Sequence, residues 1–163
     1  MSDLKQCILI VDVQTGFINE YTKHIPLLVE NIQHKYKYAV AAKFFNPEHS
    51  FFRKLIKWDR FSPDSNDVEL AFNFRKDGLI IEKSIYSCVS DDFINWLNDR
   101  GISAVHICGV DTDICVSKCA VDLFEMGIEP VVLSNLCASY AGTEAHNFGL
   151  ATLKRFIGES QVI

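Results

Sequence analysis

Uninterrupted apolar runs alternate along this chain with segments of helical periodicity, and this alternation constrains the fold more than any other feature. The strand-like runs cover residues 7–13, 38–45, 79–82, 102–108 and 130–133, and residues 161–163 offer a short sixth strand. Helical patterns cover residues 27–36, 50–58, 90–97, 114–126 and 143–156. Strands that are apolar throughout are typical of parallel sheets whose two faces are both covered by helices. The pattern therefore predicts an α/β fold with a parallel sheet.

The length of the chain fits one domain. A chain of 163 residues is long enough to bury a sizeable core. No linker, internal repeat or low-complexity segment divides it, so residues 1–163 are expected to form a single domain. Residues 61–75 are polar and rich in turn-forming residues, which predicts a long irregular segment at the surface.

Charge and hydropathy argue against two classes of partner. The formal net charge is −5 and no basic stripe is visible, so nucleic acid is not expected as the main partner. No apolar run reaches the roughly 18 residues of a membrane span, and the first five residues do not begin a signal peptide. The six cysteines lie mostly within apolar runs, unlike those of a disulfide framework. We therefore expect a cytoplasmic protein.

Three reactive side chains stand where predicted strands end. Asp12 closes the first strand, Lys83 follows the third, and the fourth strand leads within a few residues to Cys115. The carboxyl ends of parallel strands share one edge of the sheet, where ligands bind at the reversal of strand order. Each residue also has a plainer explanation, namely a turn cap for Asp12, a solvated surface for Lys83 and core filling for Cys115.

Together these residues suggest nucleophilic chemistry. A thiol at the start of a helix faces unpaired N–H groups and the positive end of the helix dipole, which predicts a stabilised thiolate at Cys115. A carboxylate at Asp12 could accept the thiol proton, and the Lys83 ammonium could stabilise the thiolate and the charge that develops on a substrate. The thiolate would attack a carbonyl carbon, with backbone N–H groups receiving the oxyanion.

Three segments of the chain resemble the isochorismatase-like cysteine hydrolases, a family that includes the nicotinamidases. Residues 11–17 read V-D-V-Q-T-G-F, similar to the D-x-Q-x-x-F opening of the family, and residues 82–84 resemble its lysine strand. Residues 109–116 read G-V-D-T-D-I-C-V, similar to the G-V-x-T-D-x-C-V nucleophile segment. The likeness extends from residue 7 to about residue 157. It implies a Rossmann-like, three-layer fold with a central six-stranded parallel sheet and helices on both faces.

The resemblance also implies a function and a set of site residues. It implies hydrolysis of the C–N bond of a small amide through a thioester, with Asp12, Lys83 and Cys115 as the catalytic residues. No cofactor is expected for this chain. It further implies a cis peptide between Val110 and Asp111, an oxyanion hole made by the backbone N–H groups of Asp111 and Cys115, and a substrate-binding role for Phe17. Family members often associate, so a homo-oligomer is expected.

The chain departs from the family at the position of a metal motif. Nicotinamidases carry D-x-H after the second strand, but Phe44 and Asn46 stand here, so no metal site is expected. Asp111 replaces a more usual small residue, and its carboxylate would disfavour a thiolate unless it points away or is paired. These departures keep two alternatives open: a non-catalytic homologue that serves as a ligand-binding or structural module, and a redox-sensing thiol.

An aromatic cluster falls between the second strand and the irregular segment. It comprises Phe44, Phe45, Phe51, Phe52, Trp58 and Phe61. Such a cluster is most often ordinary core. Polar residues interrupt it, however, so part of it could remain exposed and form a subunit interface.

Overall fold

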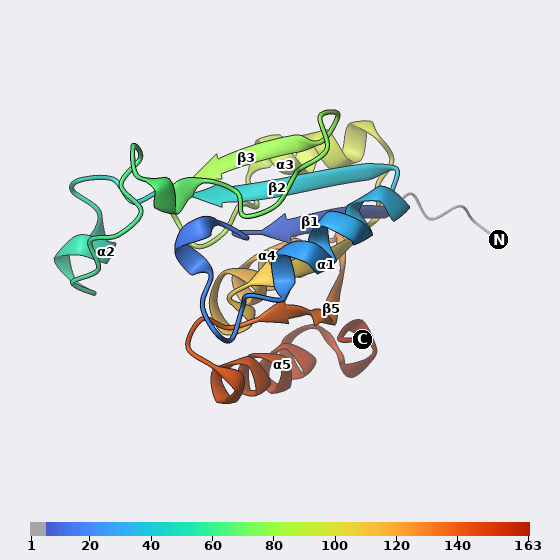
Figure 1. The fold of residues 1–163 in the computed structure, drawn as a ribbon. Helices are drawn as coiled ribbons and strands as arrows, with labels where there is room; N and C mark the ends of the chain where they lie inside the picture. Colours follow the sequence, from blue (N-terminus) through green and yellow to red (C-terminus); the bar gives the residue numbers. More distant parts are fainter. Residues whose placement is uncertain (1–5) are drawn as a thin grey trace.

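A five-stranded parallel sheet runs through the centre of the computed structural model, which describes residues 6–163 (Figure 1). In chain order the strands are β1 (Gln6–Val11), β2 (Tyr38–Phe44), β3 (Leu79–Lys83), β4 (Ala104–Val110) and β5 (Glu129–Ala138). Their order across the sheet is β3-β2-β1-β4-β5, and all neighbouring pairs are parallel. The strand order reverses between β1 and β4, so a ligand site is expected beyond the carboxyl ends of these strands.

The prediction of a sixth strand is wrong for the described residues. A 3-10 turn at Glu159–Gln161 follows the last helix, and Val162 makes only an isolated parallel bridge to Val132. The carbonyl of Ile163 accepts a hydrogen bond from the Ser134 N–H at 2.7 Å. Gln161, the first residue of the predicted strand, is part of the 3-10 turn and is therefore not available to a ladder.

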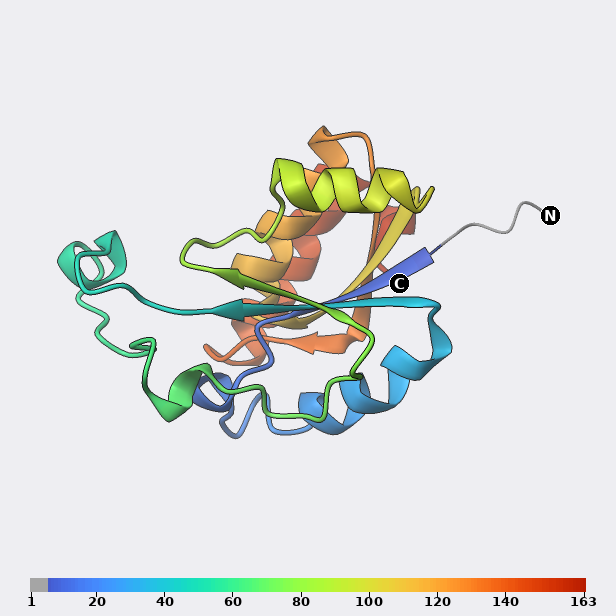
Figure 2. The same ribbon diagram turned by 90° about the horizontal axis from the view of Figure 1, so that it is seen from above.

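Helices cover the sheet on both faces and complete three layers (Figure 2). Helix α1 (Ile25–Ile32) lies on one face, where the segment of residues 61–78 also runs. Helices α3 (Asp91–Asp99), α4 (Ser117–Glu125) and α5 (Thr143–Ile157) lie on the other face. The Ser90 side chain caps α3 by accepting a hydrogen bond from the Phe93 N–H, as the sequence predicted.

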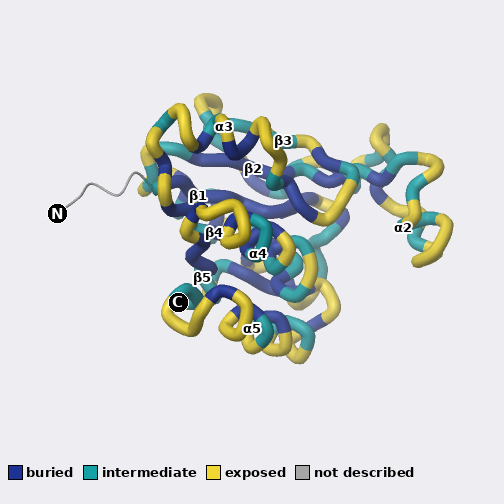
Figure 3. The backbone as a smooth tube through the Cα atoms, turned by 180° about the vertical axis from the view of Figure 1, so that it is seen from behind, coloured by how far each residue is buried: buried dark blue, intermediate teal, exposed yellow. Residues whose placement is uncertain are grey.

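The central strands are the most deeply buried part of the molecule (Figure 3). Every residue of β1 from Cys7 to Val11 is fully buried, which explains why that strand shows no alternation of polar and apolar residues. No helix within residues 6–163 is long and apolar enough to cross a membrane. The residues Met1 to Lys5, on which the expectation of no signal peptide rests, lie outside the described part of the chain.

Residues 45–62, here called the arm, project from the carboxyl edge of the sheet and carry the single turn of α2 (Phe51–Lys54) (Figure 1). Most of the aromatic cluster is buried or half-buried, and only a part of it is exposed, as the sequence predicted. Phe44 and Phe61 are buried in a second small core with Val68, and only Phe51 of the six is exposed. The other aromatic rings bury one another because the arm folds back on itself.

Candidate active site

The structure brings Asp12, Lys83 and Cys115 together at the carboxyl edge of the sheet. The Lys83 ammonium donates to Oδ2 of Asp12 at 2.8 Å, and its Nζ lies 3.8 Å from the Cys115 Sγ. The side chains of Lys83 and Asp12 are only 3% and 1% exposed, so water screens this ion pair very little. The plainer explanation of Lys83 as a solvated surface lysine is therefore wrong.

Asp12 is held in an unusual position directly after β1. Its φ of 51° lies in the left-handed region, which an aspartate tolerates better than most residues. The Oδ1 atom accepts no hydrogen bond within the described residues, although it is buried. Burial raises the pKa of Asp12, and the Lys83 ammonium and the nearby Cys115 thiol only partly oppose this rise. The carboxylate is consequently a stronger base than an exposed aspartate.

Lys83 is the last residue of β3 and is fixed by several acceptors. Besides Asp12, its Nζ donates to the carbonyls of Ile85 at 3.1 Å and Tyr86 at 3.0 Å. Burial by itself would lower the pKa of Lys83, but Asp12 and the nearby Cys115 and Cys119 together raise it. The lysine therefore remains an ammonium ion beside the Cys115 thiol.

Cys115 lies in a π-helical turn, Thr112–Val116, that leads directly into α4. Burial raises the pKa of its thiol well above the ordinary value, Asp12 adds to the rise, and the Lys83 ammonium only partly offsets it. This direction is opposite to the stabilised thiolate that the sequence predicted, because burial next to a carboxylate penalises a second negative charge. The raised pKa favours the protonated thiol.

Asp111 precedes this turn, and the peptide bond between Val110 and Asp111 is cis. Its carboxylate is paired, because Oδ1 accepts a hydrogen bond from the Tyr140 N–H at 2.7 Å. Burial raises the pKa of Asp111 to about 7, and the Tyr140 hydrogen bond opposes the rise. Pairing and a high pKa both reduce the repulsion that this carboxylate exerts on a developing thiolate.

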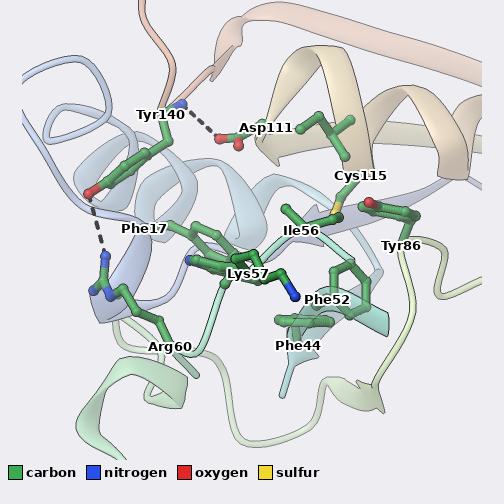
Figure 4. A pocket seen from close by; sticks show the side chains of 13 residues that line it. Phe17, Phe44, Phe52, Ile56, Lys57, Arg60, Tyr86, Asp111, Cys115 and Tyr140 are labelled. Atoms are coloured by element: carbon green, nitrogen blue, oxygen red, sulfur yellow. Dashed lines mark hydrogen bonds between the residues drawn. The ribbon is translucent and has the colours of Figure 1, made fainter. Parts of the chain in front are cut away.

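A pocket of about 350 Å³ opens in front of Cys115 (Figure 4). Phe17, which the sequence predicted to bind substrate, lines it and packs against Phe61 with ring centroids 4.2 Å apart. The arm supplies five lining residues, and the sequence analysis assigned none of them to a binding site. They are Phe52, Ile56, Lys57, Trp58 and Arg60. The aromatic cluster was the signal that could have identified this wall.

The residues at the metal-motif position do not fit a metal. Phe44 offers only a hydrocarbon ring, which stacks on Trp58 at 5.7 Å. The Asn46 amide is fully buried and donates to the carbonyls of Trp58 at 2.9 Å and Arg60 at 3.0 Å, and its oxygen accepts from Ser50. Within residues 6–163, no group of three or more His, Cys, Asp or Glu side chains could hold a metal ion. Asn46 thus secures the arm to the end of β2.

Gln14 has a structural role that the sequence analysis did not assign. Its fully buried amide donates to the carbonyls of Phe44 at 2.8 Å and Val68 at 2.9 Å. Its Oε1 accepts from the Phe44 N–H at 2.8 Å. Gln14 therefore joins the end of β2 to the segment after the arm, and this connection fixes Phe44 in the pocket wall.

Comparison with known proteins identifies the family of the chain. Residues 6–160 match the isochorismatase domain, and the chain belongs to this family. An uncharacterized isochorismatase family protein, PncA of Bacillus subtilis (strain 168), is 37% identical over 79 residues, which are 48% of this chain and 43% of that protein. The matched segment therefore spans less than half the length of that relative.

Two solved structures illustrate the likeness in fold. A pyrazinamidase of Pyrococcus horikoshii in complex with zinc has a TM-score of 0.83 and 21% identity, with 98% of each chain covered. A cysteine hydrolase from Pseudomonas syringae pv. phaseolicola 1448A has a TM-score of 0.84 and 18% identity, with 99% of this chain and 89% of that chain covered. The three-layer arrangement around a parallel sheet is thus common to all three.

Proposed function

We propose that this protein is a hydrolase that cleaves the C–N bond of a small carboxamide through a thioester on Cys115. The observation that supports it most is the position of Lys83, whose Nζ lies 2.8 Å from Oδ2 of Asp12 and 3.8 Å from Sγ of Cys115. A general base, a cation and a nucleophile thus meet beside a pocket of about 350 Å³, a size typical of small-molecule sites. Membership of the isochorismatase family and the likeness to amide hydrolases add support.

In the first half of the reaction, Asp12 accepts the thiol proton while Sγ of Cys115 attacks the carbonyl carbon. The free Oδ1 of Asp12 is the available acceptor, because Oδ2 is bound to Lys83. The carbonyl oxygen becomes an oxyanion, for which the backbone N–H groups of Asp111 and Cys115 are the proposed donors. The C–N bond then breaks, and the nitrogen takes the proton from Asp12 and leaves as ammonia or an amine.

In the second half, water attacks the thioester carbon and gives a proton to Asp12. The C–S bond breaks, the carboxylic acid leaves, and the sulfur of Cys115 recovers its proton. Lys83 stays protonated throughout, because its pKa is raised, and it stabilises negative charge on the sulfur at each step.

The direct test is ammonia release from a panel of small primary amides by the native protein and by Cys115→Ala. We expect turnover of at least one amide that vanishes in the variant, with an acyl adduct on Cys115 visible by intact-mass spectrometry after rapid quenching. Cys119→Ala is the matched control, because this residue lies one helical turn away and is fully buried. Ligand binding without Cys115-dependent turnover would instead support the non-catalytic alternative, and a sulfenic adduct without hydrolysis would support a redox sensor.

We further propose that residues 1–163 act as one domain and that the protein forms a homo-oligomer; its cytoplasmic location stays a prediction. The exposed apolar side chains of Phe51, Leu55 and Ile56 at the tip of the arm support self-association. Light scattering of the native protein and of Phe51→Ser tests this. A monomer at micromolar concentration would contradict it.

A further inference from the structure

Two of the buried cysteines, Cys88 and Cys119, are hydrogen-bonded to each other. Their sulfur atoms lie 3.7 Å apart, and the two residues are 3% and 0% exposed. The thiols of the three cysteines on the strands donate to backbone carbonyls instead. These thiols belong to Cys7, Cys108 and Cys137, and their acceptors are the carbonyls of Ile8, Leu9 and Ile107. All six cysteines lie within the described residues, and among them this is the one thiol–thiol hydrogen bond.

Cys88 lies where a small oxidant can reach it. It belongs to the irregular loop of residues 84–90 between β3 and α3, and it lines a surface cavity of about 300 Å³. This cavity is separate from the pocket in front of Cys115, because the two share no lining residue. Cys119 does not line the cavity, so a small molecule that enters it meets Cys88 first.

The surroundings of the pair favour reaction between the two sulfurs. The hydrogen bond with the Cys88 thiol lowers the pKa of Cys119 against the effect of burial, and the Lys83 ammonium also lowers it. A disulfide requires the sulfurs to approach from 3.7 Å to about 2.0 Å. Cys88 is in no helix or strand, so no backbone ladder opposes this movement of the loop.

The loop that carries Cys88 also fixes the Lys83 ammonium group. The loop carbonyls of Ile85 and Tyr86 accept hydrogen bonds from its Nζ at 3.1 Å and 3.0 Å. Cys119 lies on α4, one helical turn after the nucleophile turn. A bond between the two sulfurs would thus tie the loop that holds the lysine to the helix that follows the nucleophile.

We infer that Cys88 and Cys119 form a second reactive site, a dithiol that peroxide converts to a disulfide tying the loop of residues 84–90 to α4. The Cys88 sulfur attacks one peroxide oxygen while its proton passes to Cys119; an S–O bond forms, the O–O bond breaks and hydroxide leaves. The Cys119 sulfur then attacks the Cys88 sulfur; the S–S bond forms, the S–O bond breaks, and water leaves with the Cys119 proton. The two sulfurs together lose two electrons, which the peroxide gains.

Peptide mass mapping after treatment with hydrogen peroxide tests the site. Trypsin separates the two cysteines, because Cys88 is the one cysteine of residues 84–100, whereas Cys119 shares the peptide of residues 119–154 with Cys137. After the remaining thiols are alkylated, we expect these two peptides to be joined by a bond that dithiothreitol cleaves. The crosslink should vanish in Cys119→Ala. Cys137→Ala is the matched control and should keep it, because this change removes a buried thiol from the same peptide.

Thermal unfolding tests whether the disulfide ties the loop to α4. The measurement uses Cys115→Ala, which excludes oxidation of the nucleophile and in which the crosslink should form as in the native protein. The two cysteines are 31 residues apart, so Tm should rise by about 5–10 °C on oxidation and fall again with dithiothreitol. The rise should be absent when Cys88→Ala is added.

The inference does not depend on the proposed hydrolysis, because the dithiol acts without Cys115. A Cys88 thiol that stays free while Cys115 is oxidised would overturn it, as would a crosslink to the peptide of residues 101–118. A crosslink between Cys88 and Cys119 without a rise in Tm would overturn the tie between the loop and α4. If Cys119→Ala fails to fold, Cys88→Ala and the crosslink in the native protein decide the question.

Discussion

The buried ion pair between Lys83 and Asp12 yields the most informative prediction. Lys83→Met removes the cation and leaves the Asp12 carboxylate buried, with one oxygen already unpaired and the other newly so. Breaking a buried pair from one side costs about 3–5 kcal/mol, whereas domains of this size have a total stability of about 5–15 kcal/mol. The variant should therefore lose a large share of its free energy of unfolding.

The double variant Asp12→Asn/Lys83→Met separates stability from activity. A neutral amide costs less to bury than an unpaired carboxylate, and asparagine tolerates the left-handed backbone at this position. We expect the double variant to recover at least about 2 kcal/mol relative to Lys83→Met. Both should lose turnover by roughly a thousandfold or more, because Lys83→Met removes the stabilising charge and the double variant also removes the proton acceptor.

Urea unfolding followed by circular dichroism measures the stabilities, with equal m-values confirming that the same transition is compared. Lys118→Met is the control, because it breaks an exposed pair with Asp122 on α4 and should cost less than about 1 kcal/mol. If Lys83→Met is within about 1 kcal/mol of the native protein, or if the double variant is no more stable than the single one, the reasoning about the pair is refuted.

Three further predictions concern the nucleophile turn and its surroundings. Iodoacetamide should label Cys115 before the other five cysteines, which are buried. The rate of Cys115 labelling should rise about tenfold per pH unit up to pH 9, because the pKa of the thiol is raised. A plateau of this rate below pH 7 would contradict the prediction. The pKa of Asp111 is raised to about 7, so the contribution of this carboxyl to stability is fully present below about pH 4 and is lost as pH rises to about 7. Between those pH values, the free energy of unfolding of Asp111→Asn should rise relative to that of the native protein by at most about 4 kcal/mol. A difference in urea unfolding that does not change with pH would exclude this effect. Gly149→Ala should lower both Tm and turnover, because a Cβ at this position would lie 2.7 Å from the Cα of Asp113. This effect should exceed the gain of about 1 kcal/mol in helix propensity from glycine to alanine. An unchanged Tm would contradict the prediction.

Much of the fold could be predicted because buried strands and helix caps have recognisable local sequence patterns. Residues 7–11 are apolar throughout because both faces of β1 are covered. Ser90 indicates the start of α3 because a cap binds a backbone N–H within three residues of itself. The same reasoning predicted a sixth strand at residues 161–163, and this prediction was wrong. Residues 161–163 are apolar enough for a strand, but whether they pair depends on the turn after α5, which local patterning does not encode.

The sequence could predict which residues form the candidate site, but it could not predict how burial and charge shift their pKa values. Parallel strands place their carboxyl ends at one edge, so Asp12, Lys83 and Cys115 could be expected to meet before any distance was known. The protonation state of Cys115 could not be read this way. It depends on how deeply the thiol is buried and on the nearby Asp12 carboxylate, and both raise the pKa of the thiol.

The sequence by itself determined the parallel α/β fold, the family and the three reactive residues, because strand periodicity and short motifs are local properties of a chain. Only the tertiary structure decided the character of the pocket. Phe44, Trp58 and Arg60 reach it because Asn46 and Gln14 secure the arm and the segment after it to the end of β2. Those contacts join residues distant along the chain, so the same aromatic cluster that suggested an interface became the wall beside Cys115.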